Sequence, residues 1–341
     1  MTFTFGIYPG GAVGGDEGVV EPVRPDDAAL IRQALDDLHG DPHGDLHGDP
    51  GSDPSSELHE DPPAFLVRSY LPFRPPAGSG ERPVPAEPEN LLGNGRKLEL
   101  VLGYRDPDGD LEGWLAFVRA AVTAHGDRTA LLQICEEPNA DLPCLDGRTP
   151  GARRALVHGV VAAAEQARDL GLDLAVGFNA VPTFDADLGF WQDLAAIAAA
   201  EAPGFHAALG YVGFDFFPDV FRPIPPADLA RAVTAVLTDF RERVLPAAGI
   251  GADVPIRIAE NGWSTGGGRS EQRQAEVVQT VLTTVLGLSE PLAITGYSHF
   301  CLRDADSASS SLYYGFGLLR DDYTRKPAFA VYRRACRRQL V

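Results

Sequence analysis

Acidic and amide side chains stand at the ends of several apolar, strand-like runs in this sequence. Glu136 and Glu137 end one run, Asp215 ends a second, Glu260 ends a third, and Asn179 lies near the end of a fourth. Cleavage of a glycosidic bond needs two carboxyl groups, because one protonates the leaving oxygen while the other attacks or activates water. Glu137 and Glu260 are the candidates for such a pair if the fold brings them face to face.

The apolar runs alternate with helical patterns along almost the whole chain, and this alternation predicts the fold. The expected strands are rich in β-branched and aromatic residues and cover residues 2–8, 64–71, 98–104, 130–136, 174–180, 208–216, 256–262 and 293–300. Such an α/β pattern predicts a single-domain (β/α)8 TIM barrel over residues 1–341, rather than an open doubly wound sheet. Catalytic groups of these barrels lie at the carboxyl ends of the strands, so the acids should meet at one mouth.

Two stretches interrupt the alternation. Residues 72–97 carry too many prolines for a full helix, so we expect an irregular connection with at most a short helix. Residues 39–63 contain three HGD units and an acidic tail, and they read as a low-complexity insertion on the face away from the mouth. A His/Asp-rich tract can bind metal, but its glycines and prolines supply no rigid ligand geometry, so a solvated insertion is the prediction.

The charge and the composition exclude several classes of protein. The chain has 48 acidic against 29 basic residues and a net charge of −19, so no nucleic-acid or membrane partner is expected. The start of the sequence lacks a basic segment followed by an apolar one, and no run of about 18 apolar residues occurs, which favours a soluble, cytoplasmic protein. The four cysteines show no CxxC spacing and predict free, buried thiols.

Three motifs carry a resemblance to a known group of enzymes. They are EEPN at 136–139, IAENGWST at 258–265 and FGLLRDDYTRKPAF at 316–329, and they occur in order at the expected strand ends. Together they resemble the clan A glycoside hydrolases, which are retaining glycosidases built on a (β/α)8 barrel. The resemblance implies that Glu137 is the general acid/base and Glu260 the nucleophile of a double displacement. It implies a carbohydrate or glycoside as the partner, and no cofactor or metal ion.

The resemblance also indicates residues around the substrate. Arg68 stands where relatives carry an arginine that hydrogen-bonds the nucleophile, and Trp263 would form a platform for a sugar ring. His299 ends the eighth strand, where relatives place an aromatic residue. Arg68 could instead form a structural ion pair lower in the barrel. Trp263 could be a core residue, and His299 could be an ordinary buried histidine. Four further strand-end residues complete the expected binding set: Tyr8, Asn179, Asp215 and Asn261.

Two features depart from the pattern of these relatives. Glu136 stands where they have an asparagine that binds the sugar 2-hydroxyl, and the sixth strand, GFDFFPD at 213–219, offers no tyrosine for the nucleophile. If the strand curls, Glu136 and Glu137 both reach the pocket, and the crowded acids share a proton or accept a cationic substrate group. An alternative is therefore a degenerate glycosidase-like protein that binds a sugar or glycosylated metabolite. A metal-dependent barrel hydrolase fits less well, because no HxH pair ends the first strand.

Overall fold

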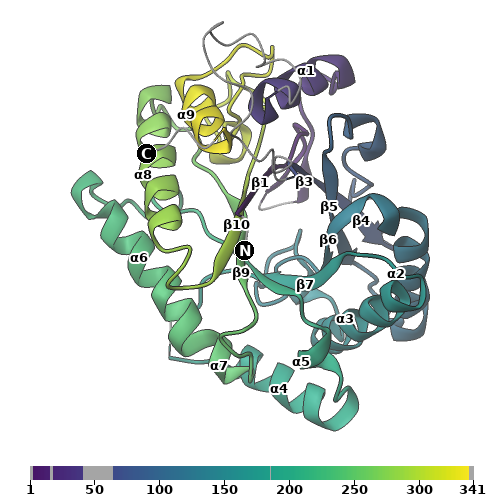
Figure 1. Ribbon diagram of the computed structural model, residues 1–341. Coiled ribbons are helices and arrows are strands. Elements are labelled where there is room, and N and C mark those ends of the chain that lie inside the picture. The colour runs from purple at the N-terminus through teal and green to yellow at the C-terminus, as the bar shows by residue number, and fades with distance from the viewer. Residues whose placement is uncertain (1–2, 16–17, 41–63, 185, 338–341) are drawn as a thin grey trace, which may run out of the picture.

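The computed structural model describes residues 3–15, 18–40, 64–184 and 186–337. Within these residues eight parallel strands form a closed barrel, with helices on its outside (Figure 1). The strands are β1 (Thr4–Ile7), β4 (Leu66–Phe73), β5 (Lys97–Tyr104), β6 (Thr129–Ile134), β7 (Ala175–Ala180), β8 (Tyr211–Asp215), β9 (Ile256–Asn261) and β10 (Ile294–His299). Each predicted run overlaps one of them, so the predicted (β/α)8 fold is confirmed.

The barrel closes at β1, which pairs with β10 on one side and with β4 on the other. Gly6 lies at this closure, opposite both Ser298 and Leu66. A Cβ atom on Gly6 would lie 2.6 Å from the Ser298 hydroxyl oxygen and 2.9 Å from Leu66 Cβ. Only glycine fits between these neighbours, so this residue permits the close approach of the strands.

Helices with one apolar face cover the strands. They are α1 (Ala28–His39), α2 (Leu111–His125), α3 (Ala152–Asp169), α4 (Gly189–Glu201), α5 (Phe205–Ala208), α6 (Leu229–Asp239), α7 (Leu245–Ala247), α8 (Glu271–Gly287) and α9 (Pro327–Cys336). Asp27, Asp110 and Ser270 begin α1, α2 and α8 by accepting hydrogen bonds from backbone N–H groups of the first turn. The buried faces of these helices and the outer faces of the strands form the core.

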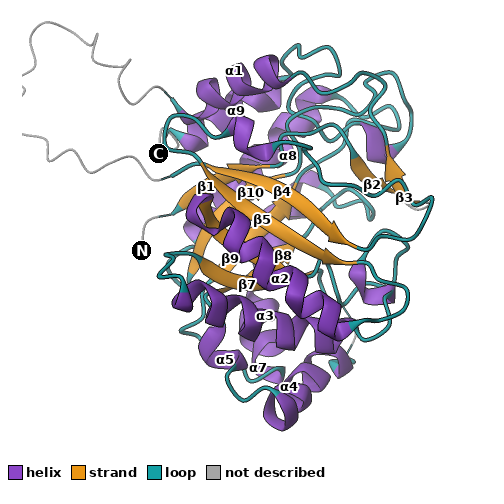
Figure 2. Ribbon diagram, turned by 90° about the vertical axis from the view of Figure 1, so that its right-hand side faces the viewer, coloured by secondary structure: helices purple, strands orange, loops and turns teal. Residues whose placement is uncertain are grey.

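Two connections at the carboxyl ends of the strands shape the mouth. The connection from β4 to β5 contains a 3-10 turn at Pro88–Leu91, as the prolines predicted, and Val84 pairs with the backbone of Tyr70. The sequence did not predict the hairpin of β2 (Val13–Gly15) and β3 (Gly18–Val20). Figure 2 shows this hairpin beyond the carboxyl ends of β4 and β5.

Three further expectations concern the insertion, the membrane and the cysteines. From residue 41 onward, the insertion predicted at 39–63 lies outside the described residues. No helix in the described ranges is long and apolar enough to cross a bilayer. All four cysteines are free, as predicted, although Cys144 and Cys336 are only partly buried while Cys135 and Cys301 are buried.

Candidate active site

The chain bends sharply after β6, and the bend presents two adjacent acids to the barrel mouth. Cys135 has a φ of 66° and Glu137 a φ of 42°, a left-handed conformation that non-glycine residues seldom adopt. The N–H of Glu136 donates to Asp146 Oδ2, and that of Glu137 donates to Asn179 Oδ1, both at 2.8 Å. These bonds hold the bend, so Glu136 and Glu137 both line the pocket although neighbours on a regular strand point to opposite faces.

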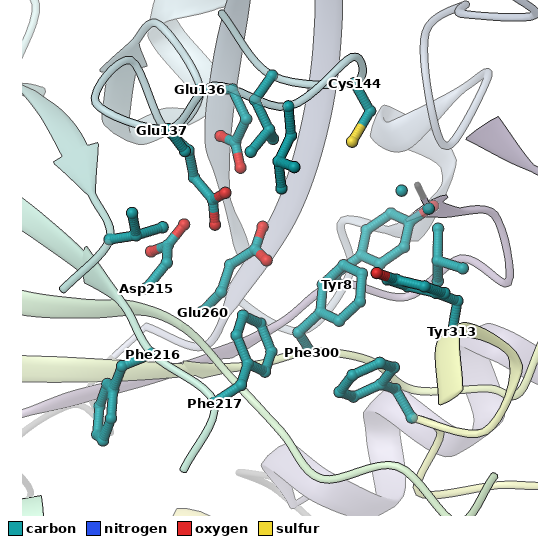
Figure 3. Close-up of a pocket in the computed structure, with 18 of the residues that line it drawn as sticks. Tyr8, Glu136, Glu137, Cys144, Asp215, Phe216, Phe217, Glu260, Phe300 and Tyr313 are labelled. Atoms are coloured by element: carbon teal, nitrogen blue, oxygen red, sulfur yellow. The ribbon is translucent and has the colours of Figure 1, made fainter. Parts of the chain in front are cut away.

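Four carboxyl groups converge beside this bend. They belong to Glu136, Glu137, Asp215 at the end of β8, and Glu260 on β9. One oxygen of each lies within 4.8 Å of one oxygen of every other, and Figure 3 shows the four side chains directed toward one another. They border a pocket of about 780 Å³. The structure thus brings together acids that lie on different strands.

Glu260 is held by donors from β4, on the other side of the mouth. Arg68 Nε donates to Glu260 Oε1 over 3.2 Å, which is the contact expected from the resemblance, and the Tyr70 hydroxyl donates to the same oxygen. Burial raises the pKa of Glu260, while Arg68 and the Tyr70 hydrogen bond lower it. The sixth strand has no tyrosine that binds Glu260, as the sequence indicated, and Tyr70 on β4 supplies a hydroxyl donor instead. Because Tyr70 follows Arg68 by two residues on a strand, side-chain alternation was a signal that could have identified it.

The Arg68 guanidinium connects several acids at the floor of the pocket. It is fully buried and donates to Glu99 Oε1 at 2.8 Å, to Gln133 Oε1 at 3.0 Å and to Glu136 Oε2 at 3.3 Å. Arg68 therefore forms ion pairs with Glu99, Glu136 and Glu260 together, and Arg257 lies 3.9 Å from Glu99 as a second positive charge. The four clustered acids outnumber the nearby cations, and this imbalance favours the protonated form of at least one acid of that cluster.

Glu137 is the acid whose pKa suits proton donation near neutral pH. Burial is the largest cause that raises its pKa, the negative charge of Glu260 is the second, and Arg68 opposes them, which places the value at about 8. A carboxylic acid with this pKa keeps its proton at neutral pH and can transfer it to a leaving oxygen. Glu137 therefore has the protonation state of a general acid.

Asn179 links the remaining two acids of the cluster. Its Nδ2 donates to Asp215 Oδ2 at 2.5 Å and to Glu136 Oε2 at 3.3 Å. Asp215 Oδ1 is buried and has no hydrogen-bond partner among the described residues. Burial is the main cause that raises the pKa of Glu136 and of Asp215 well above the usual range; Glu260 adds to it and Arg68 opposes it. Both environments disfavour the charged form.

Tyr8 and Asn261 lie in different positions relative to the pocket. Tyr8 lines it, its ring stacks on Phe300 at 5.4 Å, and its buried hydroxyl has no partner among the described residues. Asn261 lies outside the lining, where its Nδ2 donates to the Phe216 carbonyl at 2.5 Å and its Oδ1 accepts from Tyr297 at 2.7 Å. Tyr8 can reach a ligand, whereas Asn261 holds neighbouring strand ends together.

Trp263 and His299 lie behind the pocket, and the structure does not bring them to the acids. Trp263 Nε1 donates to the Asp219 carbonyl at 3.2 Å, and the Arg269 guanidinium lies over its ring at 5.0 Å. His299 packs against Tyr332 with 5.2 Å between ring centroids, and burial lowers its pKa to about 3, so it is neutral. Substrate-binding roles for these two residues stay predictions.

Aromatic side chains face the acids across the pocket, and most of them were not predicted from the sequence. Figure 3 shows Phe217, Phe300 and Tyr313 across the pocket from Glu137. Phe300 follows His299 directly. The prediction that the last residue of the strand faces the pocket therefore selected the residue one position before the correct one. Phe217 and Tyr313 belong to loops, which have no periodic pattern from which their direction could be predicted.

The four clustered acids also form the one group of described residues that could offer ligands to a metal ion. Carboxylate oxygens suit hard cations such as Mg²⁺ and Ca²⁺. However, donors from β4, β6 and β7 already bind oxygens of three of these acids. The expected absence of a metal stays a prediction.

Comparisons with known proteins bear on the fold. No protein-family model matches the chain, and no curated protein sequence matches it. Among solved structures, a family 17 glycoside hydrolase, the β-1,3-glucanosyltransferase from Rhizomucor miehei, matches 96% of this chain and 96% of its own, with a TM-score of 0.58 and 13% identity. A fungal β-1,4-galactanase matches 79% of this chain and 87% of its own, with a TM-score of 0.53 and 12% identity.

A third similar structure is larger. The β-D-glucuronidase from Dictyoglomus thermophilum matches 99% of this chain, with a TM-score of 0.57 and 10% identity, and this chain spans 50% of its length. Likeness at such low identity extends to the fold alone. The chain therefore has the closed parallel barrel that occurs in these glycoside hydrolases.

Proposed function

We propose that this protein is a retaining glycoside hydrolase, with Glu260 as nucleophile and Glu137 as general acid/base. The spacing of the two acids carries the proposal, because one oxygen of each lies within 4.8 Å of the other. Retaining enzymes hold these groups about 5–5.5 Å apart, whereas inverting enzymes leave about 6.5–9.5 Å for a water molecule. The short spacing supports direct attack on the sugar.

In the first step Glu260 attacks the anomeric carbon. Arg68 and Tyr70 bind Oε1, which leaves Oε2 as the attacking atom, and both donors stabilise the carboxylate anion. Glu137 transfers its proton to the glycosidic oxygen while the bond from that oxygen to the anomeric carbon breaks. The products are a glycosyl ester on Glu260 and the free alcohol of the leaving group.

In the second step the same two residues exchange roles. The ester has no negative charge, and the charge of Glu260 is the second cause that raises the pKa of Glu137. That pKa therefore falls, and the Glu137 carboxylate can take a proton from the water that attacks the anomeric carbon. The ester bond breaks, Glu260 regains its charge, and the sugar leaves with its original configuration.

Glu136 motivates one competing proposal, a protein that binds a sugar or glycosylated metabolite without efficient hydrolysis. A third acid beside the pair adds negative charge where the clan A pattern has a neutral amide. The lack of a tyrosine on the sixth strand was the other reason for this proposal. It carries less weight, because Tyr70 supplies a hydroxyl donor to Glu260. Trapping of the covalent intermediate separates the two proposals.

The experiment uses a panel of 2-deoxy-2-fluoro aryl glycosides that differ in their sugar. At least one should add a single fluorosugar to the peptide that contains Glu260, and Glu260→Ala should remain unlabelled. Azide should restore turnover of an activated aryl glycoside by that variant and give a product of inverted configuration. Asp141→Ala is the control, because this acid lies on the loop after β6 with 87% of its side chain exposed, and labelling should persist.

Two outcomes would contradict the hydrolase proposal. Undiminished turnover by Glu260→Ala would remove this residue from the reaction. Binding of several glycosides without labelling or turnover would instead favour the sugar-binding protein.

A further inference from the structure

Large apolar side chains stand exposed at the rim of the active-site pocket. Six such side chains are exposed in the described part of the chain, and three of them line this pocket: Leu142 at 46%, Phe184 at 73% and Phe221 at 55% exposure. They come from the separate loops that follow β6, β7 and β8. Because exposed apolar side chains cost free energy in water, their gathering from three loops at one mouth indicates a binding surface.

The apolar surface continues from this rim toward the acids. The Phe221 ring lies 6.2 Å from Tyr313 and 6.3 Å from Phe217, and Phe217 lies 6.1 Å from Phe300. Phe300 stacks on Tyr8, whose ring meets the edge of the tyrosine that binds the nucleophile. Aliphatic residues extend the lining on other sides: Val13, Val19, Leu71, Val84, Val181 and Ile224. We call these five aromatic residues the aromatic wall: Phe221, Tyr313, Phe217, Phe300 and Tyr8.

Several charged side chains of the lining outside the acid cluster already form hydrogen bonds with protein groups. Arg105 forms two hydrogen bonds with Glu81, at 2.6 and 2.7 Å. The Arg222 guanidinium, which lies over the Phe184 ring at 5.3 Å, is the exception at the rim. Each sugar unit of an extended oligosaccharide needs hydrogen-bond partners for its hydroxyls, since a buried polar group without a partner is costly. Phenylalanine and aliphatic side chains cannot supply them.

We infer that the pocket takes a glycoside whose aglycone is large, apolar and ring-containing. The sugar lies at the acids, and the aglycone lies along the aromatic wall toward Phe184 and Phe221. A pocket of about 780 Å³ falls in the range of about 300–1,000 Å³ that holds drug-sized ligands. This inference rests on the proposed glycoside hydrolase and names the class of its substrate.

The first experiment measures binding of 4-alkylphenols, from methyl to butyl, to the full chain by calorimetry. The alkyl group changes apolar area at nearly constant acidity of the phenol, and no sugar need be known. Burial of each added methylene should lower Kd roughly fourfold until the wall is covered. The 4-alkylphenyl glycosides of the preferred sugar should show the same progression in kcat/KM.

Surface variants locate the effect. In the variant that combines Phe184→Ser and Phe221→Ser, each added methylene should lower Kd by less than about twofold, because the rim no longer covers the alkyl chain. Both side chains are exposed, so the fold should persist. Leu170→Ser is the control: Leu170 is also an exposed apolar side chain, at 46%, but it follows α3 and does not line the pocket. It should leave the dependence unchanged.

The outcomes separate this inference from the proposed function. A flat phenol series, or a higher kcat/KM for oligosaccharides than for alkylphenyl glycosides of the same sugar, would overturn the apolar aglycone and leave hydrolysis standing. A steep phenol series in a chain that cleaves none of the glycosides would overturn the hydrolase and keep the apolar site.

Discussion

Tyr70 donates its hydroxyl hydrogen to Glu260 across the mouth of the barrel, from a strand that is not adjacent to β9. Arg68 Nε donates in turn to the Tyr70 oxygen at 2.7 Å, so a positive charge stands behind the hydroxyl. Hydrogen bonds in such a chain polarise one another. Burial raises the pKa of Tyr70 well above its usual range, which keeps the hydroxyl a donor. Glu260 therefore has both a charge and a hydroxyl to stabilise its anion.

Tyr70→Phe should lower kcat/KM by about 10- to 100-fold, the effect of losing one hydrogen bond to a charged group. The Tyr70 hydrogen bond lowers the pKa of Glu260, so without it that pKa rises and the acidic limb of the pH profile should move to higher pH. Tyr8→Phe is the comparison, since the Tyr8 hydroxyl has no partner among the described residues and its loss should leave the acidic limb in place. An unmoved limb in Tyr70→Phe would count against the contact.

Glu137→Ala should affect substrates according to their leaving groups. Alkyl glycosides need a strong proton donor and should lose more activity than activated aryl glycosides, which leave without one. In the unaltered chain kcat/KM should be present below a pH of about 8 and decline above it, because Glu137 must hold its proton. Paired kinetics on both substrate types check the role, and equal losses would argue for a structural effect.

Glu136→Asn tests which acid holds the shared proton. Burial raises the pKa of Glu136, so we expect it to be protonated and to donate to the sugar as an asparagine would. The variant should then stay active, with the alkaline limb of its pH–rate profile moved upward because only Glu137 still titrates there. If the profile is unchanged, Glu136 has no part in the mechanism. Improved binding of neutral sugars would instead indicate an ionised Glu136.

Asp215→Asn should stabilise the fold. The variant loses no hydrogen bond, because an amide oxygen can still accept from Asn179. Burial raises the pKa of Asp215, so the folded chain keeps a proton that the unfolded chain releases above a pH of about 4. Ionisation then costs stability as pH rises toward the folded-state pKa. The stability gained by the variant should grow with pH, by at most about 1.4 kcal/mol per unit.

Unfolding in denaturant at several pH values measures this difference. Asp141→Asn is a suitable control, because its side chain is 87% exposed and its replacement should show no such trend. A gain that shrinks with rising pH would mean that Asp215 is ionised in the fold.

Sequence patterns located the acids because barrel strands deliver their last residues to one mouth. Glu137 and Glu260 could be named on that ground, and alternation from Arg68 would also have given Tyr70. The bend at Cys135 could not be predicted. Its left-handed backbone is held by bonds to side chains from distant segments, and local propensity alone argues against it.

Side-chain directions beyond the strand ends were the harder part. Trp263 follows Glu260 by three residues, but its indole donates to the Asp219 carbonyl and does not line the pocket. The segment 213–219 was noted only for its lack of a tyrosine, whereas its Phe217 forms part of the aromatic wall. Such directions depend on how one loop packs on another, which no single segment encodes.

The closure of the barrel at Gly6 has a consequence for how activity arises during folding. Glu260 on β9 and its donors on β4 are separated around the ring by β10 and β1, so they meet only when β1 is paired with both of its neighbours at this seam. Helices can form before the seam closes, because their contacts are local, whereas the seam joins the two ends of the chain. After dilution from denaturant, recovery of turnover would therefore lag behind recovery of the helical circular dichroism signal, and the delay would measure how long the barrel takes to close around Glu260.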